Sequence, residues 1–129
     1  MATFIFTKRI IEGKEIEVFN KGKMKRDFTF IDDIVNGIMG AVNLKKKFEH
    51  RIYNLGNNNP EDLSDFINLI EETLAIRAKK KLLPIQPGDV KETFAEISES
   101  TKDLNFMPKV NIEEGIPKFV EWYKSFYRI

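Results

Sequence analysis

The spacing of apolar side chains predicts a helix over residues 2–11, followed by a short strand. The helix has its apolar face at Phe4, Ile5, Ile10 and Ile11. Thr7 and the two basic residues after it are expected to face solvent, and Gly13 to follow the helix end. Over residues 15–20 polar and apolar side chains alternate at first, which is typical of a half-buried strand.

A second amphipathic helix is predicted to begin at Asp32 or Asp33, where a carboxylate can cap free N–H groups. The two carboxylates could also serve metal or acid–base chemistry, but the helical pattern after them favours capping. The expected buried stripe consists of Ile34, Val35, Ile38, Ala41 and Val42. Gly37 and Gly40 each lower helix propensity by roughly 1 kcal/mol relative to Ala. We therefore expect another backbone to pack closely against these two glycines.

The second half of the chain is predicted to contain two extended segments and three helices. The extended segments are residues 52–55 and 79–85, and helices are expected at 60–75, at 98–104 and from Asn111 onward. The first of these helices should bury Leu63, Phe66, Ile67, Ile70 and Leu74. The last should bury Ile116, Phe119, Val120, Tyr123 and either Phe126 or Tyr127. The predicted fold class is thus α/β, a small mixed domain of about five helices and three or four short strands.

Composition indicates one ordinary globular domain over residues 1–129, with 42% hydrophobic and 32% charged residues. A formal net charge of +1 provides no field that would attract nucleic acid or a membrane surface. The lysine triplets 45–47 and 79–81 are interpreted as solvated faces, and the single histidine as a surface residue. The absence of cysteine excludes disulfides and thiolate chemistry. No apolar run reaches the roughly 18 residues of a membrane span and no signal peptide is recognised, so we expect a cytoplasmic protein.

Candidate chemistry concentrates in residues 22–33, where a cationic glycine-containing loop leads into the second helix. Arg26 lies at its centre, and a guanidinium presents a fixed fork of donors that suits bidentate capture of phosphate. Lys23 and Lys25 would add a less directional positive field. Residue types alone leave an alternative open, a plain loop in which Arg26 pairs with Asp27 or with solvent.

Four stretches resemble one known family in their order and approximate spacing. They are Arg-Asp-Phe-Thr-Phe-Ile-Asp-Asp at 26–33, Tyr-Asn-Leu-Gly-Asn-Asn-Asn-Pro at 53–60, Leu-Leu-Pro-Ile-Gln-Pro-Gly-Asp-Val at 82–90 and Glu-Glu-Gly-Ile-Pro-Lys-Phe-Val-Glu-Trp-Tyr at 113–123. Together they resemble the C-terminal part of extended short-chain dehydrogenase/reductases, the NAD-dependent sugar-nucleotide epimerases and dehydratases. Within that family the chain looks most like the UDP-glucuronate 4-epimerases.

The resemblance implies a substrate-binding role for six residues. Arg26 matches the arginine that binds the diphosphate, and Asp89 matches a carboxylate that accepts hydrogen bonds from the ribose hydroxyls. Gln86 stands where galactose-type epimerases carry a second diphosphate arginine, so this chain departs from that pattern. The alternative for Asp89 and Gln86 is a polar turn built on the Pro-Gly between them.

The other three implied residues act through their backbone. Glu17 and Phe19 match strand positions whose backbone groups pair with uracil. Thr3, near the start of the first helix, is expected to present backbone N–H to phosphate. The implied partner is a UDP-sugar, which this chain alone would bind weakly.

The resemblance also implies machinery that the sequence lacks. The family binds NAD on an N-terminal Rossmann domain and uses a Tyr-x-x-x-Lys pair to move protons during epimerisation at C4. Here no tyrosine has a lysine four residues on, and Gly37-x-x-Gly40 falls inside a predicted helix instead of after a strand. We therefore expect a C-terminal piece of a longer parent, with NAD bound by the parent and no cofactor, metal or catalytic residue in this chain.

Two readings of function follow. The first is the UDP-sugar-binding portion of an NAD-dependent epimerase, not catalytically competent alone. The second is a stand-alone interaction module derived from that domain. In both, apolar surface on the first helix at Phe4 and Ile5, or on residues 52–55, is expected to favour a homo-oligomer. Nucleic-acid binding through the lysines is a remote third possibility.

Overall fold

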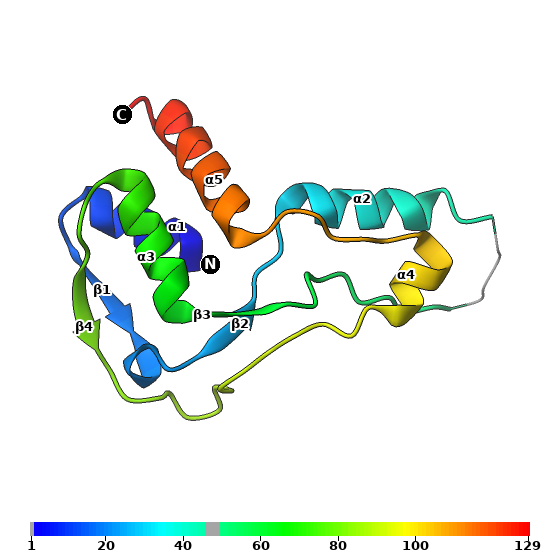
Figure 1. The fold of residues 1–129 in the computed structure, drawn as a ribbon, viewed down its shortest axis with the longest axis horizontal. Helices are drawn as coiled ribbons and strands as arrows, with labels where there is room; N and C mark the ends of the chain where they lie inside the picture. The colour runs from blue at the N-terminus through cyan, green and yellow to red at the C-terminus, as the bar shows by residue number, and fades with distance from the viewer. Residues whose placement is uncertain (1, 46–49) are drawn as a thin grey trace.

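The computed structural model describes residues 2–45 and 50–129, which contain five α-helices and two short two-stranded sheets (Figure 1). The helices are α1 (Ala2–Ile11), α2 (Ile31–Val42), α3 (Leu63–Leu74), α4 (Ser98–Leu104) and α5 (Ile112–Tyr127). The strands are β1 (Glu15–Val18), β2 (Lys25–Asp27), β3 (Pro60–Asp62) and β4 (Lys79–Leu82), with a 3-10 turn η1 (Phe19–Gly22) after β1. The predicted mixed α/β class is confirmed. Two residues of the lysine triplet at 45–47 lie outside the described part of the chain.

The two sheets differ in strand direction. β1 pairs with β4 in parallel, with Ile16 opposite Lys80, whereas β2 pairs with β3 in antiparallel orientation, with Arg26 opposite Glu61. A parallel pair needs a long crossover, and the chain between β1 and β4 includes the helix α3. Figure 1 shows α1, α3 and α5 gathered at the end of the molecule that holds β1 and β4, while α2 and α4 lie at the other end.

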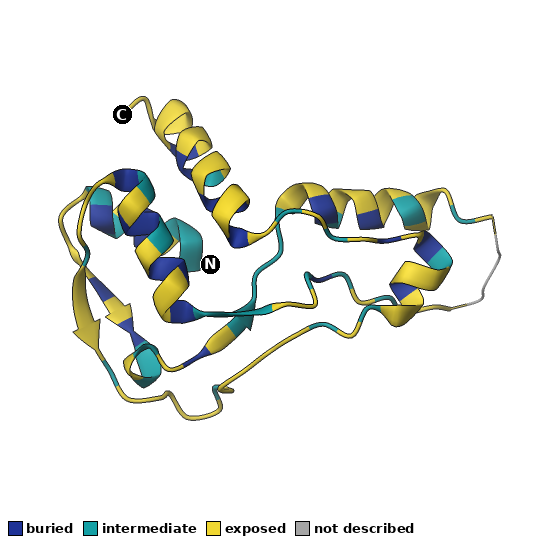
Figure 2. Cartoon of the chain, in the orientation of Figure 1, coloured by how far each residue is buried: buried dark blue, intermediate teal, exposed yellow. Residues whose placement is uncertain are grey.

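The hydrophobic core lies at the end formed by α1, α3 and α5, where most of the buried residues of the ribbon are found (Figure 2). Its members are Phe6, Ile10, Ile16, Val18, Met24, Leu63, Phe66, Ile67, Ile70, Leu74, Ile112, Ile116 and Val120. The predicted apolar face of α3 is buried in full. Phe28, just after β2, stacks on Phe66 of α3 with ring centroids 3.9 Å apart. This stacking ties the strand that carries Arg26 to the core.

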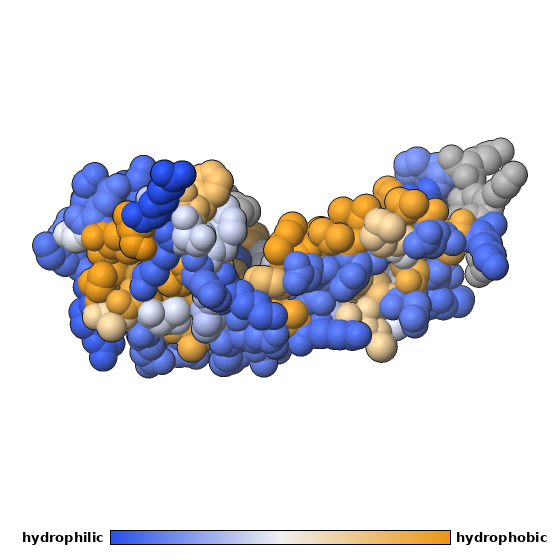
Figure 3. Space-filling view, turned by 90° about the horizontal axis from the view of Figure 1, so that it is seen from above, coloured by the Kyte–Doolittle hydropathy of each residue, from blue (hydrophilic) through white to orange (hydrophobic). Residues whose placement is uncertain are grey.

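The side-chain exposure along α2 contradicts the burial predicted for its apolar stripe. Val35 and Ile38 are about half exposed and Val42 is 70% exposed, and Ile31 and Met39 extend the same open surface. The space-filling view shows these apolar side chains along the outside of the molecule (Figure 3). We call this surface the α2 face, defined by Ile31, Val35, Ile38, Met39 and Val42.

The buried side of α2 consists of small and acidic residues. A Cβ on Gly37 would lie 2.6 Å from a Leu55 methyl carbon, and one on Gly40 would lie 2.7 Å from the Leu104 carbonyl oxygen. The expected approach of another backbone is therefore confirmed at Gly40, whereas at Gly37 the close neighbours are the side chains of Leu55 and Phe106. Asp33 is buried and accepts the N–H groups of Lys109 and Val110 at 3.1 and 3.0 Å. The capping prediction is thus wrong for Asp33, because its carboxylate serves the segment before α5.

Four further predictions need correction. Residues 52–55 form no strand, since no described strand runs beside them, and the Asn54 carbonyl instead accepts from the Ser100 hydroxyl. The helix expected from Pro60 begins at Leu63, because residues 60–62 pair with β2 as β3. Thr7 is fully buried instead of exposed. Near the end of α5, Phe126 and Tyr127 are 64% and 45% exposed, whereas Tyr123 is buried as expected.

Among the described residues, every helix is too short or too polar to span a membrane.

Glu71, near the end of α3, is buried and binds three groups that follow it in the chain. Its carboxylate accepts the Ala78 N–H at 2.9 Å and pairs with Lys80 at 2.9 Å and Arg77 at 3.0 Å. Burial raises the pKa of Glu71, but the bonds from Lys80, Ala78 and Arg77 outweigh burial, so the pKa lies below its ordinary value of 4.5. The carboxylate thereby connects α3 to the start of β4.

The lowered pKa of Glu71 predicts an acid-sensitive contribution to stability. That contribution is present in full above the pKa of an unfolded glutamate and is lost as the pH falls through the lower folded value. Glu71→Gln should therefore destabilise the protein at pH 7, and the difference from wild type should shrink below about pH 4. Denaturant unfolding at several pH values measures this, with the exposed neighbour variant Glu72→Gln as the control. A difference that stays constant down to pH 3 would contradict the role given to the carboxylate.

Candidate binding site

Arg26 and Asp89, two predicted site residues that are 63 positions apart in the chain, form an ion pair with Nη2 and Oδ1 2.8 Å apart. Their side chains are 25% and 30% exposed, so the pair lies at the surface without being fully solvated. A second guanidinium nitrogen of Arg26 donates to the Lys25 carbonyl at 2.8 Å. These two bonds leave further guanidinium donors for an additional acceptor. The alternative in which Arg26 pairs with Asp27 is not observed, since Asp27 accepts three backbone N–H groups elsewhere.

Asp89 lies in a tight turn that also contains Gln86. The Asp89 N–H donates to the Gln86 carbonyl at 3.1 Å, and Gly88 has a φ of +82°, a left-handed conformation that glycine adopts without strain. The Val90 N–H donates to Oδ1 of Asp89 at 2.9 Å, the same oxygen that binds Arg26. The predicted polar turn is therefore real, and it places Asp89 beside Arg26.

Glu17 and Phe19 lie next to the start of the same connection. The Leu83 N–H donates to the Val18 carbonyl at 2.9 Å, and the Lys21 N–H donates to the Leu83 carbonyl at 3.1 Å. Backbone groups of successive strand residues point to opposite sides, and Val18 faces β4. The backbone of Glu17 is therefore directed to the other edge of β1, where the described residues include no further strand.

Thr3 is the predicted site residue that the structure does not bring to this cluster. It lies half-buried in the first turn of α1, and α1 packs on β1 and α3. Among the described residues no hydrogen bond or ion pair joins Thr3 to Arg26, Asp89 or Gln86.

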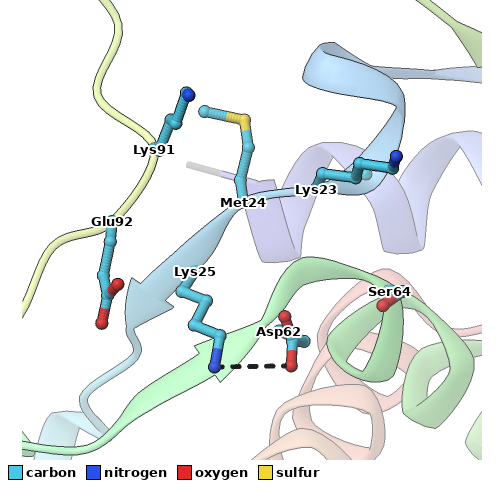
Figure 4. Close-up of a pocket in the computed structure, with 8 residues that line it drawn as sticks. Lys23, Met24, Lys25, Asp62, Ser64, Lys91 and Glu92 are labelled. Carbon is cyan, nitrogen blue, oxygen red and sulfur yellow. Dashed lines mark ion pairs between the residues drawn. The ribbon is translucent and has the colours of Figure 1, made fainter.

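A shallow depression of about 380 Å³ lies beside β2, with Lys25 in its lining (Figure 4). The lining residues are Gly22, Lys23, Met24, Lys25, Asp62, Ser64, Lys91 and Glu92. Because side chains alternate along a strand, Arg26 points to the other face of β2 and takes no part in the lining. The sequence predicted the cationic character of Lys23 and Lys25. It carried no signal that Lys91 would line the same depression, because the backbone hydrogen bond between Lys25 and Lys91 that brings it there arises from tertiary packing.

Several acidic side chains lie near Glu61, on the strand that pairs with β2. Glu61, opposite Arg26 in the β2–β3 pair, has a raised pKa because of burial and the nearby carboxylates of Glu113, Asp65 and Asp62. No group of three or more histidine, cysteine or acidic side chains that could hold a metal ion occurs among residues 2–45 and 50–129. The guanidinium of Arg26, on β2, thus contacts the carboxylate of Asp89, on the irregular connection between β4 and α4. This combination is suited to binding an anion with an adjacent hydroxyl-bearing group.

Comparison with known sequences finds similarity to sugar-nucleotide epimerases. The sequence model described as "NAD dependent epimerase/dehydratase family" matches residues 2–56. An uncharacterized protein of Methanocaldococcus jannaschii is 54% identical over 95% of this chain and 37% of its own length. UDP-glucuronate 4-epimerase 5 of Arabidopsis thaliana is 42% identical over 98% of this chain and 33% of its own length.

Solved structures agree with the sequence matches. The UDP-glucuronic acid 4-epimerase of Bacillus cereus, solved with UDP-glucuronic acid and NAD, superposes with a TM-score of 0.90 at 31% identity. The match covers 98% of this chain and 40% of that enzyme, so the chain spans well under half the length of these relatives. Residues 2–56 thus match the NAD-dependent epimerase/dehydratase family, and nearly the whole chain is similar to the C-terminal portion of UDP-glucuronate 4-epimerases.

Proposed function

We propose that residues 1–129 form one domain that binds the nucleotide end of a UDP-sugar in an NAD-dependent epimerase of the UDP-glucuronate 4-epimerase type. The observation that carries this proposal is the contact between Arg26 and Asp89, which brings a phosphate-binding group and a hydroxyl acceptor together. The likeness to relatives that are named for UDP-glucuronate supports the choice of ligand.

The contacts that Arg26 and Asp89 make support the roles proposed for them. Arg26 keeps donors for the diphosphate, and Asp89 offers its second carboxylate oxygen to the ribose hydroxyls. Gln86, in the same turn, supplies a neutral polar neighbour. The outward backbone of Glu17 and the neighbouring Phe19 would pair with uracil. Thr3, in the first turn of α1, would present backbone N–H to phosphate.

Catalysis is assigned to the part of the whole protein that this chain does not span. There, NAD would accept and return the hydride at C4, in a cytoplasmic enzyme of polysaccharide biosynthesis. This chain would hold no NAD, would bind a UDP-sugar in the millimolar range or more weakly, and would not turn it over. Its near-neutral net charge gives no basis for a nucleic-acid partner.

Arg26→Ala tests the diphosphate contact. A charge-assisted hydrogen bond contributes roughly 1.5–3 kcal/mol, so the variant should bind UDP about ten- to a hundred-fold more weakly. Arg26→Lys should recover only part of that loss, because an ammonium lacks the fork. Shift changes of backbone amides during UDP titration measure the affinity. Arg51→Ala, which breaks an arginine ion pair with Glu99 elsewhere on the surface, is the matched control. If UDP affinity is unchanged while stability falls, Arg26 stabilises its loop and does not bind the diphosphate.

Asp89→Asn tests the ribose contact separately. The amide keeps one acceptor oxygen but loses the negative charge, so hydroxyl donors bind it more weakly. We expect a larger loss of affinity for UDP than for inorganic diphosphate, which has no ribose. Equal losses for both ligands would show that Asp89 acts only through the phosphate side of the site.

A second candidate function, self-association, is favoured by the α2 face. Its five apolar side chains are 47–70% exposed on a single helix, and open apolar patches of this kind tend to find partners. Of the surfaces expected from the sequence, Ile5 and Ile52 are exposed, at 47% and 72%, whereas the Phe4 ring packs edge-on against Tyr123. We therefore propose a homo-oligomer formed through the α2 face, the alternative being that this surface meets the remainder of the whole protein.

Light scattering on the isolated chain distinguishes the outcomes. A homo-oligomer should give a mass of at least twice 15.1 kDa, and Ile38→Lys, which puts a charge in the middle of the α2 face, should restore the monomer. Asn36→Lys adds the same charge at an exposed polar position of the same helix and should leave the mass unchanged. A wild-type mass near 15.1 kDa at high concentration would rule the oligomer out.

A further inference from the structure

The connection between β4 and α4 carries both Gln86 and Asp89, yet it contains no helix or named strand. Its start is fixed by the Leu83 N–H, which donates to the Val18 carbonyl at 2.9 Å. Between that point and α4 most side chains are exposed, so little apolar packing holds the segment in place. Hydrogen bonds must therefore set the position of Asp89 relative to Arg26.

Three consecutive residues of β2 supply those bonds. The Lys25 N–H donates to the Lys91 carbonyl at 2.9 Å, and the Lys25 carbonyl accepts from Thr93 at 3.3 Å. Arg26 binds Asp89 through its side chain, as described above. The Asp27 carboxylate then accepts the N–H of Ala95 at 2.8 Å. The connection thus lies along β2 from Asp89 to Ala95, and Asp27 provides the last of these attachments to β2.

Asp27 also fixes a second segment at the same point. Its Oδ1 accepts the Asn57 N–H and its Oδ2 accepts the Asn58 N–H, both at 3.0 Å. Gly56 allows this convergence, because a Cβ there would lie 2.3 Å from Ala95 Cβ and 2.9 Å from Asp27 Oδ2. Asp27 is thereby the common acceptor for the backbone on both sides of β2.

We propose that Asp27 is the positioning residue of the Arg26–Asp89 site: its carboxylate sets the end of the connection so that Asp89 lies against the guanidinium. Asparagine replaces it only in part, because its amide nitrogen would face at least one of the three backbone N–H donors and its uncharged oxygen accepts the others more weakly. The effect on ligand affinity rests on the proposed function, whereas the effect on the Arg26–Asp89 pair does not.

The test follows the side-chain N–H resonances of Arg26 by NMR in the 129-residue chain, identified by their loss in Arg26→Lys. In Asp27→Asn these resonances should move toward their positions in Asp89→Asn, where the partner carboxylate is altered directly. Affinity for UDP should fall about ten-fold, the effect of losing one charge-assisted bond to the ribose, and affinity for inorganic diphosphate should fall less, as expected for Asp89→Asn.

The matched control is Asp33→Asn. Asp33 also accepts backbone N–H groups from a distant segment, so its loss should lower stability similarly, but it holds the segment before α5. Its Arg26 resonances should stay at the wild-type positions. If Asp27→Asn does not fold, Gly56→Ala replaces it, because the added Cβ would push Ala95 away from an intact Asp27. Gly40→Ala, with its Cβ against Leu104, is then the control.

The outcomes separate the two proposals. Arg26 resonances that shift in Asp27→Asn or Gly56→Ala, but not in the control, support the positioning role even if the wild type binds no UDP. In that case only the proposed function fails. Arg26 resonances that stay in place, or that shift equally in variant and control, overturn the positioning role whatever the affinity for UDP.

Discussion

Two carboxylates, those of Asp27 and Asp33, accept backbone N–H groups from segments 30 to 77 positions away in the chain. In a protein with larger sheets such groups would bond to neighbouring strands, and a buried group left unpaired would cost free energy. The described sheets have only two strands each, so the irregular segments at residues 57–58, at Ala95 and at residues 109–110 depend on side-chain acceptors instead. The position of the candidate site depends on the first of these carboxylates, and the docking of the chain before α5 on α2 depends on the second.

This dependence explains where sequence reasoning succeeded and where it failed. The helices α1, α4 and α5 have boundaries close to those predicted, and α3 ends where expected although it begins three residues late. Periodicity and capping residues are local signals, and Asn111 accepts the Glu114 N–H as a cap should. The apolar stripe of α2 was recognised, but periodicity cannot say which side of a helix its neighbours cover. Gly37, Gly40 and Asp33 form the buried side, and the glycines alone carried a signal for it. Residues 52–55 have the composition of a strand, but strand formation requires a partner strand, which no local pattern can supply.

For the candidate site, the residues came from resemblance and their arrangement came from the structure. Nothing in the sequence indicated that Arg26 and Asp89 would bind each other, because their contact depends on a turn at Gly88 and on attachments to β2. A ligand that enters here meets an arginine that already has a carboxylate partner. The pair keeps the guanidinium oriented before binding, at the cost of some of its charge, so that affinity depends on geometry as much as on attraction.

The strand β4 has a further consequence for how copies of this protein meet. It is Lys-Lys-Lys-Leu, all four residues are exposed, and its one sheet neighbour is β1. An open strand edge is a template on which another chain can add, and lysines along such an edge discourage this by mutual repulsion. Lys80 is partly neutralised by Glu71, which leaves Lys79 and Lys81 to repel an approaching copy. The β4 edge of the parallel sheet is thus protected against growth by strand addition, the usual first step toward fibrous aggregation, even though the same molecule exposes an apolar helix face.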